Sequence, residues 1–550
     1  MNPPNPLDAV AEVVAGFGIG ARRVREAVAL LAEGPRTLDE LVRECALPRR
    51  TVEALLAAAR PDLDGNPEAG AALRADRADA YRERFATAAL LATRPADPFA
   101  AQLAAHPELL AAARADIAAA PAARAALDHV SVTAETVVRR ALWLAGTFDL
   151  PGARLLCVGD HDLTSLTVAA LVPELAVTVV DLDERLLEFV EDRAAARGLD
   201  VRCLYADFRF GLPESVAGSA DLVLTDPPYT PEGVQLFLGR GVQGLRDRTT
   251  GRLVMAYGFS PAHPALGMKV QHAVGELELV TEAILPAFNR YHGAQAVGSA
   301  SDLYVCRPTA RTRQVLDRRL ERAAVRIYTH GAQSLEGAAH TLDPEVAEAV
   351  TTIASDGAPP VLVGPGWPRR DGASAVELSR VLTAGLPAAS ARPATVAVDL
   401  AEDPGPWLLR TLLAVNAERV AVLVPNNHPD LGNAAAQHAL SDLLAAKYTL
   451  RLRRSTPTPA HAVVEARAVG AGSSPIAHHL LTRAHGRTGN VWREALVRHA
   501  GRALTKNEAR AAVAAAVSRP AWLEVRLVDL PRHAVRGLLA EAEAGAKAPA

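Results

Sequence analysis

The sequence predicts an α/β fold built on a doubly wound parallel sheet, followed by a second, smaller α/β unit. Three observations predict this fold class. Between residues 154 and 306, short apolar runs alternate with helical stretches. The runs are apolar throughout rather than alternately polar, which is typical of parallel strands covered on both faces. An acidic residue follows each of four successive runs, at the positions where such sheets bind their ligands.

Each strand is expected where an aliphatic run is bounded by turn residues. The strands expected in the first sheet are 154–158, 177–180, 201–205, 222–225, 252–257, one near residue 283, and 303–306. Those expected in the second unit are 361–364, 395–398, 419–424, 449–452 and 462–466. The second set suggests a degenerate internal repeat over residues 340–470, in which the loop 364–367 takes the place of 159–162. Asp399 and Asp403 lie near the place of an acidic strand end.

Residues 1–80 are expected to form a winged helix-turn-helix. Thr37 and Glu40 fit a capping box at the start of one helix, and Arg49 begins the next, where a recognition helix would start. However, the first 66 residues hold eight arginines against ten carboxylates, whereas a protein that reads a DNA groove carries a basic face. A packing or dimer-forming module is therefore favoured over DNA contact.

Composition excludes several classes of protein. The 550 residues are 49% hydrophobic and 22% charged, so a wholly disordered chain is excluded. The formal net charge of −3 gives no attraction to nucleic acid or anionic lipid. No apolar run approaches about 18 residues, and no basic segment opens the chain, so we expect no membrane partner and a cytoplasmic location. The four cysteines lie far apart, and no metal site is expected.

Four acidic positions end four successive strands of the first sheet. They are Asp160 with Asp162, Asp181 with Asp183, Asp207, and Asp226 in Asp226-Pro227-Pro228-Tyr229-Thr230. A carboxylate about 20 residues past the first glycine turn can accept both ribose hydroxyls of a nucleoside, which fits Asp181 or Asp183. Asp207 is placed to accept a hydrogen bond from an adenine amino group. Two prolines fix the backbone after Asp226, so its carboxylate can bind an incoming amine and accept a proton.

The first turn, 159–165, bears on the choice of donor. Ordinary methyltransferases place a glycine-rich turn here, because the methionine carboxylate approaches backbone N–H groups. Asp160 and Asp162 would repel that carboxylate and attract an ammonium, which favours decarboxylated S-adenosylmethionine. Gly159, Thr164 and Ser165 are assigned to donor binding. For any single aspartate at a strand end, a helix cap is the alternative.

Four segments together resemble the branched-chain polyamine synthases, which are N(4)-bis(aminopropyl)spermidine synthases. The segments are Gly159-Asp160-His161-Asp162-Leu163-Thr164-Ser165, Asp226-Pro227-Pro228-Tyr229-Thr230, Asn289-Arg290-Tyr291-His292-Gly293-Ala294 and Val297-Gly298-Ser299-Ala300-Ser301-Asp302-Leu303-Tyr304. The resemblance spans residues 21–308. It implies a Rossmann-like domain of the methyltransferase type at 149–310. The implied reaction is two successive aminopropyl transfers from decarboxylated S-adenosylmethionine to the secondary amine of spermidine, with release of methylthioadenosine.

The resemblance also implies roles for individual residues. Asp160 and Asp162 match the acidic loop near the aminopropyl group and the amine substrate. Asp226 matches the carboxylate that binds and activates the attacking nitrogen. Tyr229 and Thr230 line the same pocket.

The sequence departs from the family at two places. His161 stands where the family usually has a third acid, so one cation contact is weaker or pH-dependent; a solvent-facing turn residue is the alternative for His161. Nothing in the family pattern covers residues 309–550. After the second α/β unit, residues 471–550 are expected to be helical with a frayed tail, and residues 81–148 form a helical connector before the first sheet.

The leading interpretation is an aminopropyltransferase for a polyamine substrate, with the decarboxylated donor as co-substrate and no permanently bound cofactor. A homodimer is compatible with the N-terminal module. Asp226-Pro227-Pro228-Tyr229 also resembles the motif of adenine-N6 methyltransferases, so an S-adenosylmethionine-dependent amino-methyltransferase is an alternative. A polyamine-sensing, DNA-binding regulator is the second alternative.

Overall fold

The chain divides into two compact units in the computed structural model. The structure describes residues 5–321, 326–329, 340–355, 357–368, 375–387, 393–472, 474–499 and 504–547. The first unit comprises Met1–Val177, Asp221–Ala323 and Ile327–Gly331, and the second Thr178–Ala220, Ala324–Arg326 and Ala332–Ala550. The five predicted domain ranges stay predictions, because this division groups residues 178–220 with the C-terminal half. The predicted features at residues 1–4 and 548–550 lie outside the described residues.

The residues before the first sheet form helices and one antiparallel hairpin. The helices are α1 (Pro6–Ala15), α2 (Arg22–Glu33), α3 (Leu38–Cys45), α4 (Arg49–Ala59), α5 (Ala75–Phe85), α6 (Thr87–Ala92), α7 (Ala100–Ala105), α8 (Pro107–Ala119) and α9 (Ala134–Thr147), and the hairpin strands are β1 (Leu63–Asn66) and β2 (Gly70–Leu73). The capping box at Thr37 and Glu40 is confirmed, with both reciprocal hydrogen bonds present. A shared apolar core that includes Leu31, Leu41 and Leu55 holds α1–α5 together. The winged-helix assignment itself stays a prediction.

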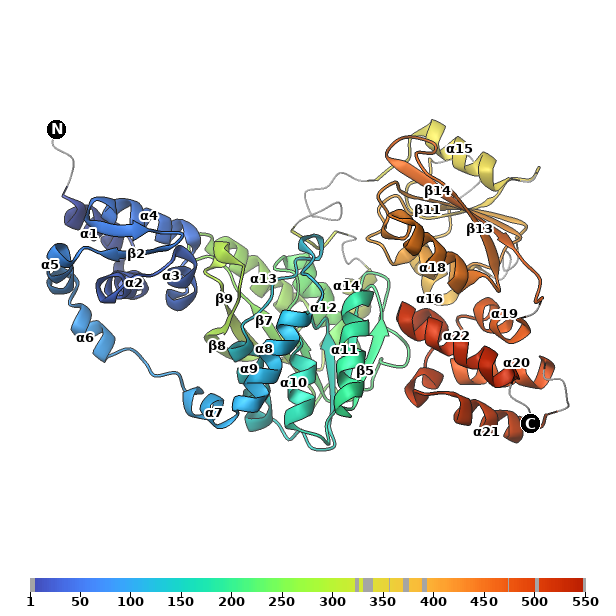
Figure 1. Cartoon of the computed structure of the whole chain (residues 1–550), viewed down its shortest axis with the longest axis horizontal. Coiled ribbons are helices and arrows are strands. Elements are labelled where there is room, and N and C mark those ends of the chain that lie inside the picture. Colours follow the sequence, from blue (N-terminus) through green and yellow to red (C-terminus); the bar gives the residue numbers. More distant parts are fainter. Residues whose placement is uncertain are drawn as a thin grey trace. The chain divides into compact units, whose positions relative to one another are not determined.

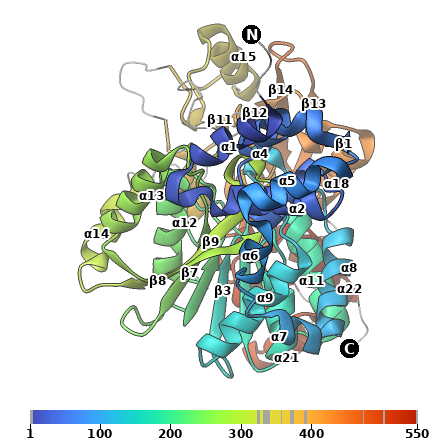
Figure 2. The same cartoon turned by 90° about the vertical axis from the view of Figure 1, so that its left-hand side faces the viewer.

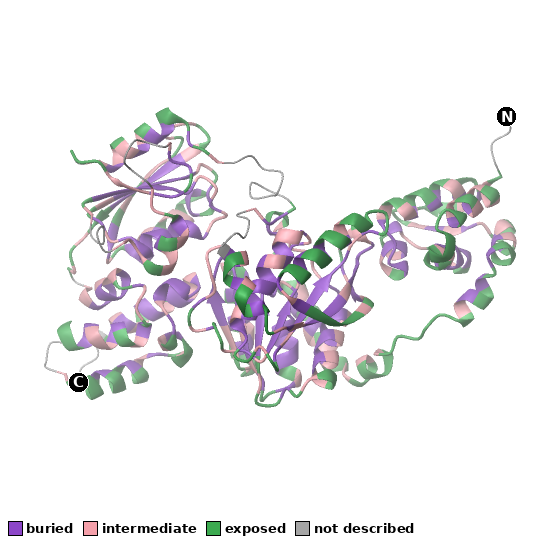
Figure 3. Cartoon of the chain, turned by 180° about the vertical axis from the view of Figure 1, so that it is seen from behind, coloured by how far each residue is buried: buried purple, intermediate pink, exposed green. Residues whose placement is uncertain are grey.

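The predicted alternation of strands and helices is confirmed in the first sheet. Its elements are β3 (Arg154–Val158), α10 (Thr164–Leu171), β4 (Ala176–Asp181), α11 (Glu184–Arg197), β5 (Val201–Tyr205), β6 (Leu222–Thr225), α12 (Pro231–Gly244), β7 (Arg252–Tyr257), α13 (Pro264–Glu276), β8 (Leu279–Arg290), β9 (Ala300–Pro308) and α14 (Thr312–Glu321). Buried side chains occupy both faces of β3 and β6, as their uninterrupted apolar runs predict. Figure 3 shows the buried strands surrounded by helices that are exposed on their outer faces.

The seven strands follow the order β5-β4-β3-β6-β7-β9-β8. β6 is parallel to both β3 and β7, but β9 is antiparallel to β7 and to β8. The predicted parallel sheet is therefore confirmed for β3, β6 and β7 and is wrong at the edge formed by β9 and β8. Residues 291–299, which join β8 to β9, are too few for the crossover of a dozen or more residues that parallel neighbours require. Helices α12 and α13 cover one face of the sheet and α9 the other, so the sheet is doubly wound (Figure 2).

The C-terminal half contains a second, five-stranded sheet (Figure 1). Its elements are α15 (Pro344–Ala354), β10 (Val361–Val363), α16 (Leu378–Ala384), β11 (Thr395–Asp399), α17 (Trp407–Ala414), β12 (Arg419–Pro425), α18 (Ala434–Leu444), β13 (Tyr448–Arg453) and β14 (His461–Ala468). Four helices follow: α19 (Pro475–Thr482), α20 (Thr488–His499), α21 (Lys506–Ala516) and α22 (Arg532–Lys547). Helix α15 packs on β11 and β12 through an apolar cluster that includes Val350 and Leu423.

The two sheets share part of their strand order. The second runs β10-β11-β12-β14-β13. Its first three strands are parallel, and β14 lies between β12 and β13 and is antiparallel to both. The first sheet has the same pattern in β3-β6-β7-β9-β8. This shared order favours the predicted internal repeat, which stays a prediction. None of the described helices is long and apolar enough to span a membrane.

Gly298, in the connection between β8 and β9, packs closely against the backbone after α3, and we predict that a side chain there would destabilise the fold. Gly298 has φ +85°, and a Cβ there would lie 2.8 Å from the backbone carbon of Ala46. Gly218 has φ +65°, and a Cβ there would meet nothing within 4 Å, so it reports backbone strain alone. We expect Gly218→Ala to cost about 1 kcal/mol and Gly298→Ala to cost more, roughly 2–3 kcal/mol. Thermal unfolding, with hydrogen exchange at residues 290–301, checks this; equal costs would contradict the close packing at Gly298.

Candidate active site

A buried arginine, which sequence reasoning missed, organises the acidic residues of the first unit. Arg140 on α9 is only 2% exposed. Its Nη1 donates to Asp162 Oδ2 at 2.6 Å, its Nη2 to Asp226 Oδ2 at 2.8 Å, and its Nε to Asn289 Oδ1 at 2.7 Å. A buried guanidinium is tolerated only with such partners. Arg140 therefore ties the loop after β3 to the loop after β6.

The surroundings of Asp226 raise the pKa of its carboxyl group toward neutrality. Its Oδ2 accepts hydrogen bonds from Arg140 and from the Tyr291 hydroxyl at 2.7 Å, and its side chain is 20% exposed. Burial, together with the nearby charge of Asp162, raises the pKa of Asp226 to about 7, although Arg140 acts in the opposite direction. A carboxylate with such a pKa can accept a proton from a substrate near neutral pH.

A chain of hydroxyl groups leads from Asp226 to Tyr229. The Tyr229 and Tyr291 hydroxyl oxygens lie 3.0 Å apart, and Ser301 Oγ lies 2.8 Å from the Tyr291 hydroxyl. Burial raises the pKa of both tyrosines well above the usual range, so both stay protonated and can donate. Tyr229, a predicted substrate-binding residue, is thereby coupled to Asp226 through Tyr291.

Asp160 caps helix α10. It is buried, and its two carboxylate oxygens accept the backbone N–H groups of Thr164 at 3.0 Å and Ser165 at 3.2 Å. The turn before it needs φ +73° at Gly159, which glycine adopts without strain. Helix N-terminal N–H groups ordinarily attract anions, and here a side chain of the protein occupies two of them. The hydroxyls of Thr164 and Ser165 are buried and have no hydrogen-bond partner among the described residues.

His161 and Thr230, two predicted substrate-binding residues, both contact other residues of the first unit. The His161 ring stacks on His129 with centroids 4.3 Å apart, and it borders a cavity of about 100 Å³ together with Asp162 and Ser131. Thr230 Oγ1 accepts the N–H of Gly233 at the start of α12 and donates to the Ile327 carbonyl at 2.7 Å. Thr230 thus has a structural role as a helix cap, whatever else it contacts.

The other predicted donor residues belong to the second unit. Asp181 accepts the backbone N–H of Asp183 at 2.8 Å, and Asp183 caps α11 and pairs with Arg185. Asp207 Oδ1 accepts from the backbone and side chain of Arg209, and its Oδ2 accepts from Arg209 Nη2 and from the Trp407 indole at 2.9 Å. Nothing in the sequence indicated the contact with Trp407, because 200 residues separate the two partners.

The structure brings together some of the predicted residues. Asp162, Asp226 and Tyr229 are linked through Arg140 and Tyr291, whereas the helix-cap alternative describes the contacts of Asp160 and Asp183. The convergence of all four strand ends on one site stays a prediction. A signal for Arg140 was available, since Arg139 and Arg140 interrupt an otherwise apolar stretch of α9. Asn289, Tyr291 and Ser301 stood in motifs that carried the resemblance but were given no role.

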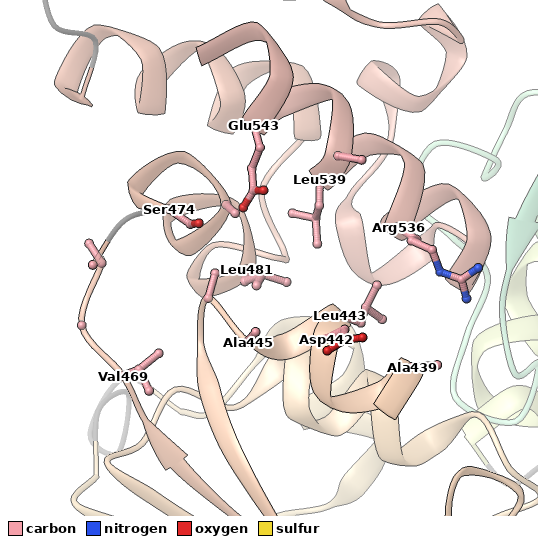
Figure 4. A pocket seen from close by; sticks show the side chains of 16 residues that line it. Ala439, Asp442, Leu443, Ala445, Val469, Ser474, Leu481, Arg536, Leu539 and Glu543 are labelled. Carbon is pink, nitrogen blue, oxygen red and sulfur yellow. The ribbon is translucent and has the colours of Figure 1, made fainter. Parts of the chain in front are cut away.

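A large cavity lies away from all of the predicted site residues. A cavity of about 660 Å³ lies in the second unit, and its wall includes Leu443, Leu481 and Leu539, with Asp442 and Glu543 beside them (Figure 4). None of the predicted site residues lines it. Among the described residues, no group of three or more His, Cys, Asp or Glu side chains is arranged to hold a metal ion.

The strand order and the alternation of strands with helices define an α/β protein with a Rossmann-like, doubly wound sheet. Residues 108–349 match the family model of the branched-chain polyamine synthase A C-terminal domain. Residues 108–349 are therefore similar to the branched-chain polyamine synthase A family, which confirms the predicted resemblance within residues 108–308. The match continues to residue 349, past the point at which the resemblance was expected to end.

Curated relatives and solved structures are similar to parts of the chain. An uncharacterised protein of Methanocaldococcus jannaschii is 34% identical over 175 residues, which are 32% of this chain and 44% of the relative. The N(4)-bis(aminopropyl)spermidine synthase of Thermus thermophilus is 36% identical over 118 residues, 22% of this chain and 34% of the relative. The chain thus spans less than half the length of these curated relatives. The crystal structure of the Thermus thermophilus branched-chain polyamine synthase with N4-aminopropylspermidine and 5'-methylthioadenosine has 24% identity and a TM-score of 0.40, covering 55% of this chain and 92% of that one.

The raised pKa of Asp226 predicts a pH-dependent stability. Because its folded pKa of about 7 exceeds the usual value of about 3.9, the group stabilises the fold at low pH, and that contribution is lost as pH rises through about 7. Asp226→Asn removes this loss. We expect the melting temperature of the variant, relative to the parent, to rise by a few degrees between about pH 5 and about pH 8.5.

The control is Asp247→Asn. Hydrogen bonds from Thr249 and Thr250 lower the pKa of this exposed aspartate, so its removal should cost more at high pH than at low pH, the opposite sign. A pH-independent difference for Asp226→Asn would contradict the raised pKa.

Proposed function

We propose that the protein transfers the aminopropyl group of decarboxylated S-adenosylmethionine to an amine of spermidine or a related polyamine. The products are a branched polyamine and methylthioadenosine, and no resident cofactor is needed. The observation that carries this proposal is the buried cluster of Arg140, Asp162 and Asp226. Two carboxylates share one guanidinium, so the cluster is negative when both are ionised and suits a cationic amine. The family of residues 108–349 points to the same chemistry.

Asp226 is the proposed base. In the first transfer, the secondary acceptor nitrogen donates a hydrogen bond to the carboxylate and keeps its lone pair for attack on the donor methylene next to the sulfonium sulfur. As the carbon–nitrogen bond forms, the carbon–sulfur bond breaks, its electrons neutralise the sulfur, and the surplus proton of the nitrogen passes to Asp226. Arg140 and Tyr291 hold the carboxylate in place, and Tyr229 lines the acceptor pocket.

Donor recognition is assigned to the remaining predicted residues. Asp181 or Asp183 would accept the ribose hydroxyls, Asp207 the adenine amino group, and the turn with Gly159, Thr164 and Ser165 would contact the donor backbone. Asp160 supports a donor without a carboxylate, because it already occupies the N–H groups of Thr164 and Ser165. His161 and Thr230 are proposed to border the acceptor pocket.

The proposal is tested by mass spectrometry of the protein incubated with spermidine and each sulfonium donor in parallel. A product heavier by one or two aminopropyl groups, formed only with the decarboxylated donor, is expected. Asp226→Asn should keep the fold and lower the rate by about two to four orders of magnitude, the usual scale for a lost base. A methylated product would establish the methyltransferase alternative instead, and a near-parental rate for Asp226→Asn would remove Asp226 from the mechanism.

Asp160→Ala tests the choice of donor. Loss of the side chain frees two helix N–H groups for the carboxylate of S-adenosylmethionine and removes a negative charge near the ammonium of the decarboxylated donor. We expect the variant to bind the decarboxylated donor more weakly while S-adenosylmethionine is affected less or bound better, by about tenfold in relative affinity. Calorimetric titration with both donors checks this. Equal losses for both would show that Asp160 acts only as a helix cap.

The N-terminal residues are proposed to be a winged helix-turn-helix that packs rather than reads DNA. Arg49, at the start of α4, donates to Gln295 Oε1 at 2.6 Å and pairs with Glu53, so its charge is used within the chain. A salt-sensitive, specific DNA complex would support the regulator alternative instead. The homodimer and the cytoplasmic location stay predictions.

A further inference from the structure

The C-terminal half contacts the proposed adenine-binding carboxylate directly. Trp407, the first residue of α17, donates its indole N–H to Asp207 Oδ2 at 2.9 Å. Its ring also packs against Phe210 and beneath the guanidinium of Arg209, with the ring centroids 5.0 Å apart and Arg209 Cζ 5.0 Å from the indole centroid. Asp207 and Trp407 are both buried. This contact joins the loop after β5 to a segment that the family pattern does not cover.

The acceptor capacity of Asp207 is filled. A carboxylate offers about four lone-pair positions, and four N–H donors occupy them: the backbone N–H, Nε and Nη2 of Arg209, and the Trp407 indole. An adenine amino group can therefore bond to Asp207 only after one of these donors leaves.

Trp407 is the donor that can leave most readily. The Arg209 side chain binds the carboxylate with two charge-assisted hydrogen bonds from one rigid group, and such bonds are about twice as strong as those from neutral donors. The indole N–H is neutral and makes a single bond. Further contacts between residues 178–220 and the C-terminal helices, such as Arg410 with Glu184 at 2.5 Å and Trp522 with Glu191 at 3.0 Å, do not involve Asp207.

We propose that Trp407 competes with the adenine amino group of the donor for the Asp207 carboxylate, so that the C-terminal half sets the affinity for the donor nucleoside. This inference rests on the proposed function, in which Asp207 recognises adenine. Because coupling between two binding events is reciprocal, nucleoside binding also weakens the contact of α17 with the loop after β5. Trp407 is thus a specificity-determining residue supplied by the extra half of the chain.

The test measures binding of methylthioadenosine to the full chain by calorimetry. Trp407→Phe keeps the aromatic packing and removes the competing N–H, and we expect it to bind the nucleoside about three- to tenfold more tightly than the parent. Trp522→Phe is the matched control, since it removes an indole–carboxylate hydrogen bond of the same kind, to Glu191 on α11. The control should bind within about twofold of the parent.

A second measurement needs no variant at Asp207. Methylthioadenosine should change the tryptophan fluorescence of the parent, and 5'-methylthioinosine, which lacks the 6-amino group, should not. The change should persist in Trp522→Phe and vanish in Trp407→Phe, which assigns it to Trp407.

The outcomes separate this inference from the function on which it rests. Equal methylthioadenosine affinity in the parent and Trp407→Phe, or weaker binding by the variant, would overturn the competition and leave the proposed function standing. An equal gain in both tryptophan variants would also overturn it, because a general loosening of the C-terminal half would then explain the result. No binding of methylthioadenosine to the parent would overturn both.

Discussion

The ion pairs of Arg140 are the interaction on which the rest of the first unit depends. A guanidinium that is 2% exposed must be paired, because an unpaired buried charge costs several kcal/mol. Its partners come from the loop after β3, the loop after β6 and strand β8. The strands and loops that supply these partners are therefore held in one arrangement, and the same requirement places two carboxylates and Tyr291 around a single site.

The aspartates at the strand ends differ in what they do, because their surroundings differ. Asp160 and Asp183 satisfy helix N-termini, a common role for aspartate. Asp226 instead faces Arg140, Tyr291 and a second carboxylate, and its pKa rises to about 7. The raised pKa lowers the stability of the fold above neutral pH, and in the proposed reaction the same carboxylate is the base.

The second sheet has part of the first sheet's strand order, and the carboxylates near its strand ends are hydrogen-bonded within the second unit. Asp399, which ends β11, accepts the N–H of Gly366 at 2.9 Å and lies 2.9 Å from His340 Nε2. Asp403 caps α17 and pairs with the buried His428. Both carboxylates are thus engaged by groups of the second unit itself.

The sequence by itself determined where most strands lie, and it predicted Asp162 and Asp226, which the structure joins through Arg140. Uninterrupted apolar runs mark buried strands such as β3, β6 and β7, and Asp-Pro-Pro-Tyr with the acidic turn marks Asp226, Asp160 and Asp162, because these signals lie within a few residues of one another. The tertiary structure alone decided that Arg140 and Tyr291 complete the cluster and that the Trp407 indole donates a hydrogen bond to Asp207. Those partners are separated by 65–200 residues along the chain. No local pattern encodes a contact that exists only because burial forces distant polar groups to satisfy one another.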